Sequence, residues 1–270
     1  MYSKGNAWPH EEYIYNQDQN ISTQLAYGIR CLDLRVMYYG NVFYVSHANW
    51  RGWPTIRQVL LEVRQFVKKT GELVLLDFHR FNQGFQQDAH RRHKQLVSVI
   101  VDELGDVLLE KTSVDDTLGF IFGFCDKKEE RKGHVLVFYN AEYKGWGDEY
   151  LANPIFHQWP NAQTVPQLLK YLQQYGCPPF FDDNLISAMA EMTPKFSSLI
   201  IGNRRAAQLA NHAVTELFRT NLSECNAIVA TDYFLGNNII GVAIEANLDR
   251  GKREARHFSY ASFKDCKDES

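Results

Sequence analysis

The sequence predicts an α/β protein whose parallel strands close into a (β/α) barrel, and three observations lead to this fold class. Apolar strands alternate with amphipathic helical segments along almost the whole chain. Several strands are continuous apolar runs, as in parallel sheets that are buried on both faces. Polar residues come at the ends of these strands, where the active sites of such barrels lie. The 270 residues, 45% of them hydrophobic, suffice for a single domain over 1–270.

Composition and charge argue against several classes of protein. A net charge of −3 without a basic cluster predicts no binding to nucleic acid. No run of about 18 apolar residues is present, so we expect no transmembrane segment, and residues 1–13 lack the pattern of a signal peptide.

The cysteines leave open whether the chain contains disulfides. Five are present, with no CxxC pair and no metal-ligand spacing, so we expect free core thiols and neither a metal nor another cofactor. One or two disulfides are the alternative if the natural protein is secreted, and sequons at Asn20 and Asn221 keep that alternative open. The compartment therefore stays open between cytoplasmic and secreted.

The first half of the chain predicts two βα units. Residues 1–16 are expected to form a loop, 17–27 a short helix that stops at Gly28, and 28–36 a strand. The turn signal Gly40-Asn41 precedes a second apolar run over 42–45, so the two runs should pair as a hairpin. A helix over 55–69, capped by Thr55, and an apolar strand over 73–76 follow.

The second half continues the alternation with less regularity. We expect a helix over 85–104, a short turn and helix over 112–120, and a strand over 135–139. Residues 145–198 are expected to form barrel strands with long loops and one clear helix over 165–175. A helix over 203–219, a strand over 226–230 and a closing helix over 239–247 complete the chain.

The candidate site begins with two charged residues in the strand over 28–36. Residues two apart on a strand project to the same side, so Asp33 and Arg35 should share one face, and the hairpin should bring His47 to them. Asp77 and Asp232 follow other apolar strands and are expected at the same C-terminal rim. The alternative is that Asp33 and Arg35 form only an internal ion pair.

The order of several motifs resembles the X domain of the phosphatidylinositol-specific phospholipase C superfamily, particularly the small eukaryotic proteins that consist of this domain alone. The resemblance runs through Gln17–Val36 (with GIRCLDLRV), FYVSH at Phe43–His47, FVKKTGELVLLDF at Phe66–Phe78, Trp159-Pro160, and NAIVATDYFLGNNII at Asn226–Ile240. It implies a distorted TIM barrel. It also implies a phosphoric diester hydrolase that cleaves phosphatidylinositol-like lipids with two histidines.

The resemblance also implies roles for individual residues. His47 matches the acid that protonates the leaving oxygen, with Asp33 orienting its ring, and Arg35 matches the arginine that stabilises charge on the phosphate. Asp232 matches the carboxylate that orients the first histidine. The expected substrate-binding residues are the polar groups at other strand ends: Asp77, His79, Arg80 and Tyr139. The implied partner is a phospholipid head group at a membrane surface, bound by a monomer.

One motif of the family is absent from the 270 residues. The family's first histidine lies in a glycine-rich strand that ends in HDS or HNS, and neither tripeptide occurs here. This predicts a barrel that lacks its first strand and a chain with much reduced turnover. A catalytically silent module that binds phosphoinositides or inositol phosphates is therefore the alternative function. A metal-dependent phosphodiesterase of the glycerophosphodiester type is less favoured, because Arg35 stands where its metal would lie.

Overall fold

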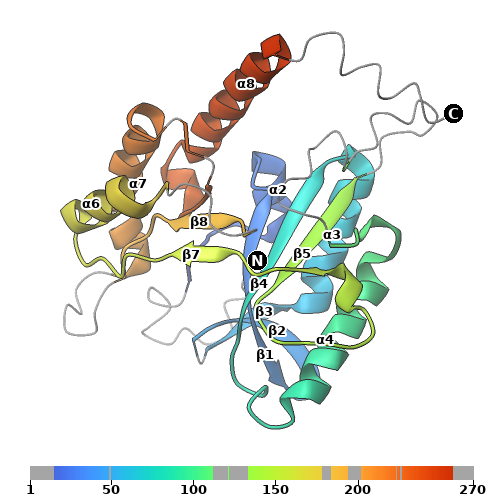
Figure 1. The fold of residues 1–270 in the computed structure, drawn as a ribbon. Helices are drawn as coiled ribbons and strands as arrows, with labels where there is room; N and C mark the ends of the chain where they lie inside the picture. The colour runs from blue at the N-terminus through green and yellow to red at the C-terminus, as the bar shows by residue number, and fades with distance from the viewer. Residues whose placement is uncertain are drawn as a thin grey trace, which may run out of the picture.

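The computed structural model describes residues 15–48, 50–111, 121, 133–177, 184–193, 202–222, 224–225 and 227–257, the last four without their side chains. The turn and helix expected over 112–120 and nearly all of the loop expected over 1–16 lie outside these residues. The strands and helices that are described alternate along the chain, as predicted (Figure 1).

Six strands form the larger sheet, in the order β3-β2-β1-β4-β5-β6. They are β1 (Cys31–Tyr39), β2 (Val42–His47), β3 (Trp50–Thr55), β4 (Leu73–Phe81), β5 (His134–Tyr139) and β6 (Leu151–Ala152). β1, β4, β5 and β6 run parallel, whereas β2 and β3 are antiparallel additions. Gly40 and Asn41 both have positive φ, 55° and 66°, as a type I′ turn requires, and the predicted hairpin is confirmed.

Three further strands form a second parallel sheet in the order β7-β8-β9. They are β7 (Phe156–Gln158), β8 (Ile186–Met189) and β9 (Ile228–Ala230). Among the described residues no ladder joins β6 to β7 or β9 to β1. The hydrogen bonding expected of a closed barrel is thus interrupted at two places, and the parallel strands form two separate arcs.

The described part of the chain also contains six α-helices. They are α2 (Ile21–Tyr27), α3 (Ile56–Thr70), α4 (Ala89–Leu104), α6 (Val165–Tyr175), α7 (Asn203–Thr220) and α8 (Ile239–His257), with 3₁₀ turns at Gly105–Val107, Asp148–Tyr150 and Phe234–Gly236. In Figure 1, α3 and α4 lie along the larger sheet, and α6 and α7 lie beside the smaller one. Thr55 and Gln58 form a capping box on α3, and Gly71 ends that helix with φ 68°.

Several elements differ from the predictions, and β3, α4 and α8 are three examples. β3 was not predicted, because its sequence WRGWPT contains Gly and Pro and shows no alternation. α4 begins at Ala89 instead of residue 85, since residues 82 and 83 instead bond to the backbone of β1. α8 extends to His257, ten residues beyond the expected end.

The core follows the two arcs. One apolar cluster fills the space between the larger sheet, α3 and α4, and includes Leu60, Phe78 and Ile100, all fully buried. A second cluster joins α6, α7 and α8 through residues such as Leu168, Leu172 and Val214. None of the helices in the described part of the chain has the length and apolar character needed to cross a bilayer.

A disulfide joins Cys177, which follows α6, to Cys225, which precedes β9. The expectation of free thiols is therefore wrong for these two cysteines, and the alternative of a disulfide is correct. Sequence spacing alone does not give this pairing, because the two residues are 48 positions apart and meet only through the packing of α6 and α7. Cys31, in β1, is a free thiol.

Residues 15–17, at the beginning of the described chain, bond to residues 231–233, which follow β9. The Tyr233 amide donates to the carbonyl of Asn16 at 2.7 Å, and Gln17 Nε2 donates to the carbonyl of Thr231 at 2.7 Å. The Tyr233 hydroxyl donates to the carbonyl of Tyr15 at 2.6 Å. This segment crosses the space between β9 and β1, where the described strands make no ladder.

Candidate functional site

A cavity of about 240 Å³ opens between β1 and β9. The four residues with expected catalytic roles, Asp33, Arg35, His47 and Asp232, all line it. Its wall also includes Asn16, Ser46, Gly52, Glu191 and Thr231. Side chains far apart in the sequence therefore meet in one space, although their roles in catalysis remain predictions.

Asp33 and Arg35 share a face of β1, as the spacing predicted. Arg35 Nη2 lies 3.7 Å from Asp33 Oδ2, and both side chains keep more than a quarter of their surface exposed. Both residues lie within β1, as expected, but the strand runs beyond the predicted end at residue 36. β1 continues to Tyr39 because its second half pairs with β2, and a shift in register against β4 falls between Leu34 and Arg35.

The charge of Asp33 is maintained by its neighbours. Partial burial raises the pKa of this carboxyl group, but the contact with His79 and the charge of Arg35 outweigh that effect and leave the pKa below its ordinary value. Asp33 is therefore an anion at neutral pH. The Arg35 guanidinium next to it has donors that remain available to a bound anion, because the ion pair is long and open to solvent.

Asp232 and Glu191 form the acidic wall of the cavity. Burial raises the pKa of Asp232 to about 6, although the hydrogen bond from Asn16 Nδ2, 2.8 Å long, and the charge of Arg35 act against this. Burial and the charges of Asp232 and Asp33 likewise hold the pKa of Glu191 well above its usual value. The wall can therefore gain or lose protons near neutral pH.

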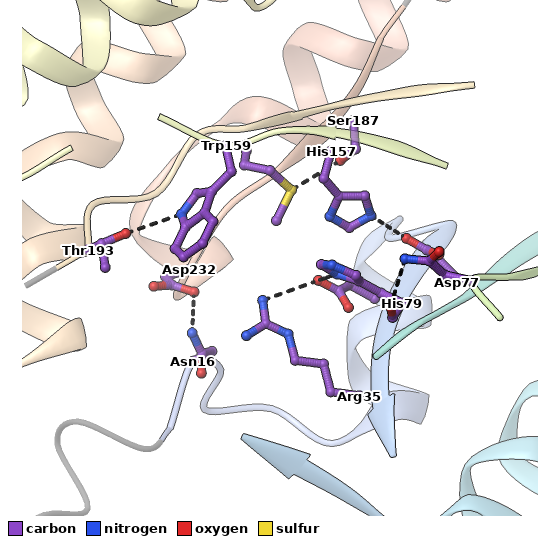
Figure 2. Close-up of polar contacts among 12 residues, drawn as sticks. Asn16, Arg35, Asp77, His79, His157, Trp159, Ser187, Thr193 and Asp232 are labelled. Carbon is purple, nitrogen blue, oxygen red and sulfur yellow. Dashed lines mark hydrogen bonds and ion pairs between the residues drawn. The ribbon is translucent and has the colours of Figure 1, made fainter. Parts of the chain in front are cut away.

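Two histidines, His79 and His157, lie near Arg35. Only His79 was predicted as a site residue. His79 Nδ1 lies 3.4 Å from Asp33 Oδ2, and His157 Nε2 lies 2.6 Å from Asp77 Oδ2. The ring centroids of His79 and His157 are 3.8 Å apart. Figure 2 shows Arg35, His79 and Asp232 directed toward a common space, with the His157 ring above that of His79.

Sequence reasoning missed His157. It lies in the three-residue strand β7, within a region that shows no sustained period, and only the alternation in IFHQW marks it. Asp77, by contrast, was expected as a substrate ligand at a strand end, but it lies within β4 and is 2% exposed. Burial raises the pKa of Asp77, and the hydrogen bond from His157 partly offsets the effect.

The other expected substrate ligands are only partly brought together. The Arg80 guanidinium lies over the Trp159 ring, 5.8 Å from its centroid, and Trp159 Nε1 donates to Thr193 Oγ1 at 3.2 Å. Tyr139 is 3% exposed and its hydroxyl lies 2.7 Å from His93 Nδ1, so it belongs to the core and not to the cavity. Tyr139 was predicted to bind substrate because it is the last residue of β5, but its side chain packs into the core.

The cavity has the components of an anion-binding and proton-transfer site. Arg35 supplies a fixed cation with a planar fork of donors, which suits phosphate oxygens. His47, the last residue of β2, supplies an imidazole to the same cavity. Asp232 and Glu191 supply carboxyl groups whose raised pKa values suit proton exchange.

Solved structures with a similar arrangement of strands and helices define the fold. The phosphatidylinositol-specific phospholipase C of Staphylococcus aureus is 13% identical, with a TM-score of 0.64 over 87% of this chain and 85% of the enzyme. The enzyme of Listeria monocytogenes is 17% identical, with a TM-score of 0.58 over 86% of this chain and 83% of the enzyme. The chain thus has the α/β fold of these phospholipases, a distorted TIM barrel, as predicted.

Curated relatives point in the same direction by sequence. PI-PLC X domain-containing protein 3 is 24% identical over 202 residues in Bos taurus and 25% identical over 202 residues in Danio rerio. These alignments cover 71% of this chain and 58% of each relative, so the chain spans less than two thirds of the length of the relatives it matches. No protein-family model matches the chain. Over these residues the chain is similar in sequence to PI-PLC X domain-containing protein 3.

Proposed function

We propose that the chain is a phosphoric diester hydrolase of the phospholipase C type, with the cavity between β1 and β9 as its site. The observation that carries this proposal is the convergence of Arg35, His47 and Asp232 on one cavity. An isolated ion pair between Asp33 and Arg35 would need neither an imidazole nor a second carboxyl group beside it. The proposed substrate is the head group of a phosphatidylinositol-like lipid, after the enzymes that share the fold.

The proposed reaction is an internal attack within the head group. An inositol hydroxyl gives its proton to water in the open cavity and attacks the adjacent phosphorus, a P–O bond to the lipid breaks, and protonated His47 gives its proton to the departing oxygen. Arg35 stabilises the negative charge that grows on the phosphate oxygens. Asp33 keeps Arg35 in place through their shared face of β1. No step of this proposal needs a bound metal ion.

The described part of the cavity has no second imidazole to accept the proton of the inositol hydroxyl. Of the described residues that line the cavity, only His47 is a histidine, and Asp232 is bonded to Asn16 instead of to an imidazole. A missing general base costs roughly two to four orders of magnitude in rate. This observation favours a second candidate function, a module that binds inositol phosphates or phosphoinositides without turnover.

Exposed aromatic side chains support a membrane surface as the place of action. Tyr39, Trp50 and Trp53 lie at the hairpin and on β3 and are 56%, 46% and 58% exposed. β3 also lends Gly52 and Pro54 to the wall of the cavity, so the aromatic residues and the site belong to the same element. We call Tyr39, Trp50 and Trp53 the aromatic edge. The structure of the S. aureus enzyme comes from work on the modulation of its membrane binding.

Replacement of Arg35 by Met tests the proposed site. If Arg35 binds phosphate, Arg35→Met lowers the affinity for inositol phosphate at fixed salt by roughly tenfold or more, while the urea midpoint changes little. The matched control is Arg57→Met, which removes an arginine that pairs with Glu103 on the outer surface. A large fall in the midpoint with unchanged binding would show that Arg35 is only structural.

Turnover separates the two candidate functions. Purified chain is incubated with phosphatidylinositol vesicles, and cyclic inositol phosphate is measured beside the binding of inositol phosphate. The hydrolase requires a product that disappears in His47→Asn while binding persists. Binding without any product, in wild type as in His47→Asn, would establish the silent module instead.

A further inference from the structure

Four titratable side chains form a compact group at the edge of the cavity. Asp33 comes from β1, Asp77 and His79 come from one face of β4, and His157 comes from β7. Asp33 and Asp77 are direct neighbours across the parallel β1–β4 pair. We call these four residues the Asp–His group. The proposed hydrolysis uses only Asp33 of this group, so the other three side chains need another explanation.

His157 is held in an unusual state for a buried imidazole. Its Nε2 lies 2.6 Å from Asp77 Oδ2, and its side chain is 11% exposed. When Nε2–H donates to the carboxylate, the lone pair of the ring is on Nδ1, and Nδ1 is buried with no hydrogen-bond partner among the described residues. Buried acceptors are rarely left unpaired. Histidines that bind metal ions usually donate their second ring nitrogen to a carboxylate in this way.

His79 and Asp33 complete a set of three donors. His79 Nδ1 is 3.4 Å from Asp33 Oδ2, longer than an ordinary hydrogen bond. One ligand atom from each of Asp33, His79 and His157 lies within 4.8 Å of the other two. An ion with bonds of about 2.0–2.1 Å in tetrahedral geometry holds its donors roughly 3.3–3.5 Å apart, so side-chain rotations can close the set.

We propose that Asp33, His79 and His157 bind a divalent transition-metal ion of the zinc class, with Asp77 orienting His157. Two imidazoles and one carboxylate favour zinc over calcium or magnesium, which prefer oxygen ligands throughout. Three protein ligands leave a fourth position open. Since Asp33 also lines the cavity, the ion lies at its edge, and it shares the Asp33 carboxylate with Arg35. This site does not depend on the proposed hydrolase function.

Metal titration of the whole chain tests the proposal. Residues 1–270 are stripped with a chelator and titrated with zinc chloride against a competing dye, and cobalt chloride is added in parallel to record visible absorption. We expect about one zinc ion per chain and cobalt bands typical of tetrahedral nitrogen and oxygen ligands. His79→Gln and His157→Gln should each weaken binding by at least tenfold and abolish the cobalt bands. Asp77→Asn should weaken it by about 10- to 100-fold, because it only orients a ligand.

Two matched variants control for other ligands. His212→Gln removes an exposed histidine of α7, and Cys31→Ser removes the free thiol of β1, and both should bind zinc like the wild type. Far-UV circular dichroism identifies any variant that fails to fold, and the wild-type cobalt spectrum does not depend on a variant. A wild type without tetrahedral cobalt bands, or folded His79→Gln and Asp77→Asn proteins with unchanged zinc affinity, would overturn the proposal.

Discussion

At the scale of single residues, Asp232 makes the charge of the cavity depend on pH. Its pKa of about 6 lies above the value near 3.8 that a free aspartate has, chiefly because it is buried. Between about pH 4 and pH 6 the folded state therefore holds a proton that the unfolded state has lost. The free energy of unfolding consequently falls as the pH rises through this window, and the cost is fully present above it.

Asp232→Asn should remove this cost. The amide oxygen can still accept from Asn16, but the buried charge is gone, so we expect the variant to be more stable than the wild type by roughly 3 kcal/mol at pH 7.5 and equally stable near pH 4. Urea unfolding at the two pH values measures the difference. Asp249→Asn, which changes an exposed aspartate, should show no such dependence. Parallel curves for Asp232→Asn and wild type would contradict the assignment of the raised pKa.

The residue pattern of the sequence predicted part of the site. Asp33 and Arg35 could be placed on one face because a strand has a period of two, and this inference needs only local geometry. His79, Asp77 and His157 come together through the pairing of β4 with β1 and the position of β7, which are long-range arrangements. Asp33, Asp77 and His79 were expected at the site, but the short alternation around His157 was too weak to place that residue beside them, so the Asp–His group as a whole was not predicted.

At the scale of elements, β3 carries two residues of the aromatic edge. Trp50→Ala and Trp53→Ala should each reduce the binding of the chain to phosphatidylinositol-containing vesicles by roughly tenfold, because an exposed indole loses apolar contact with the lipid surface. Sedimentation with vesicles measures the bound fraction. Tyr175→Ala, which removes an exposed aromatic residue from the end of α6, is the control. Equal losses in all three variants would show that β3 has no special part in membrane binding.

The disulfide joins the elements on either side of α7. Closing a loop between residues 48 apart restricts the unfolded chain, so Cys177→Ser with Cys225→Ser should lower the free energy of unfolding by about 2–4 kcal/mol. Denaturation of wild type with and without a reducing agent gives a second measure of the same quantity. The control is Cys31→Ser, because Cys31 is a free thiol. A wild type that is insensitive to the reducing agent would show that the pair contributes no stability.

Secondary structure was predicted best where the sequence pattern is local. The capped helix α3, the hairpin turn and the helix α6 all have signals within a few residues, and their boundaries were nearly right. β3 was missed because its pairing with β2 overrides a composition that disfavours strands. β4 is longer than predicted because Asp77 and His79, which look like residues after a strand, lie within it. Their polar side chains have partners in the Asp–His group.

At the scale of the whole molecule, the prediction of a single domain can be tested by unfolding. Residues 15–18 bond to α7 and to the loop after β9: Arg204 pairs with Asp18, and the Phe234 amide donates to Gln17 Oε1 at 3.1 Å. These contacts tie the two arcs together, so we expect one cooperative transition, with coincident changes in tryptophan fluorescence and far-UV circular dichroism. Gln17→Ala should move both signals equally. Separate transitions would show that the arcs unfold as two domains.

The absence of a described ladder between β9 and β1 should make this part of the structure open more easily. A ladder resists opening because many backbone bonds must break together, but within the described residues this seam depends on the bonds made by residues 15–17. Among the described residues, few bonds therefore oppose local opening at this seam. In hydrogen–deuterium exchange, the amide of Tyr233 should lose protection earlier than the amides inside β4 and β5. Such opening would widen the cavity that β1 and β9 line, while the core between the larger sheet, α3 and α4 stays intact.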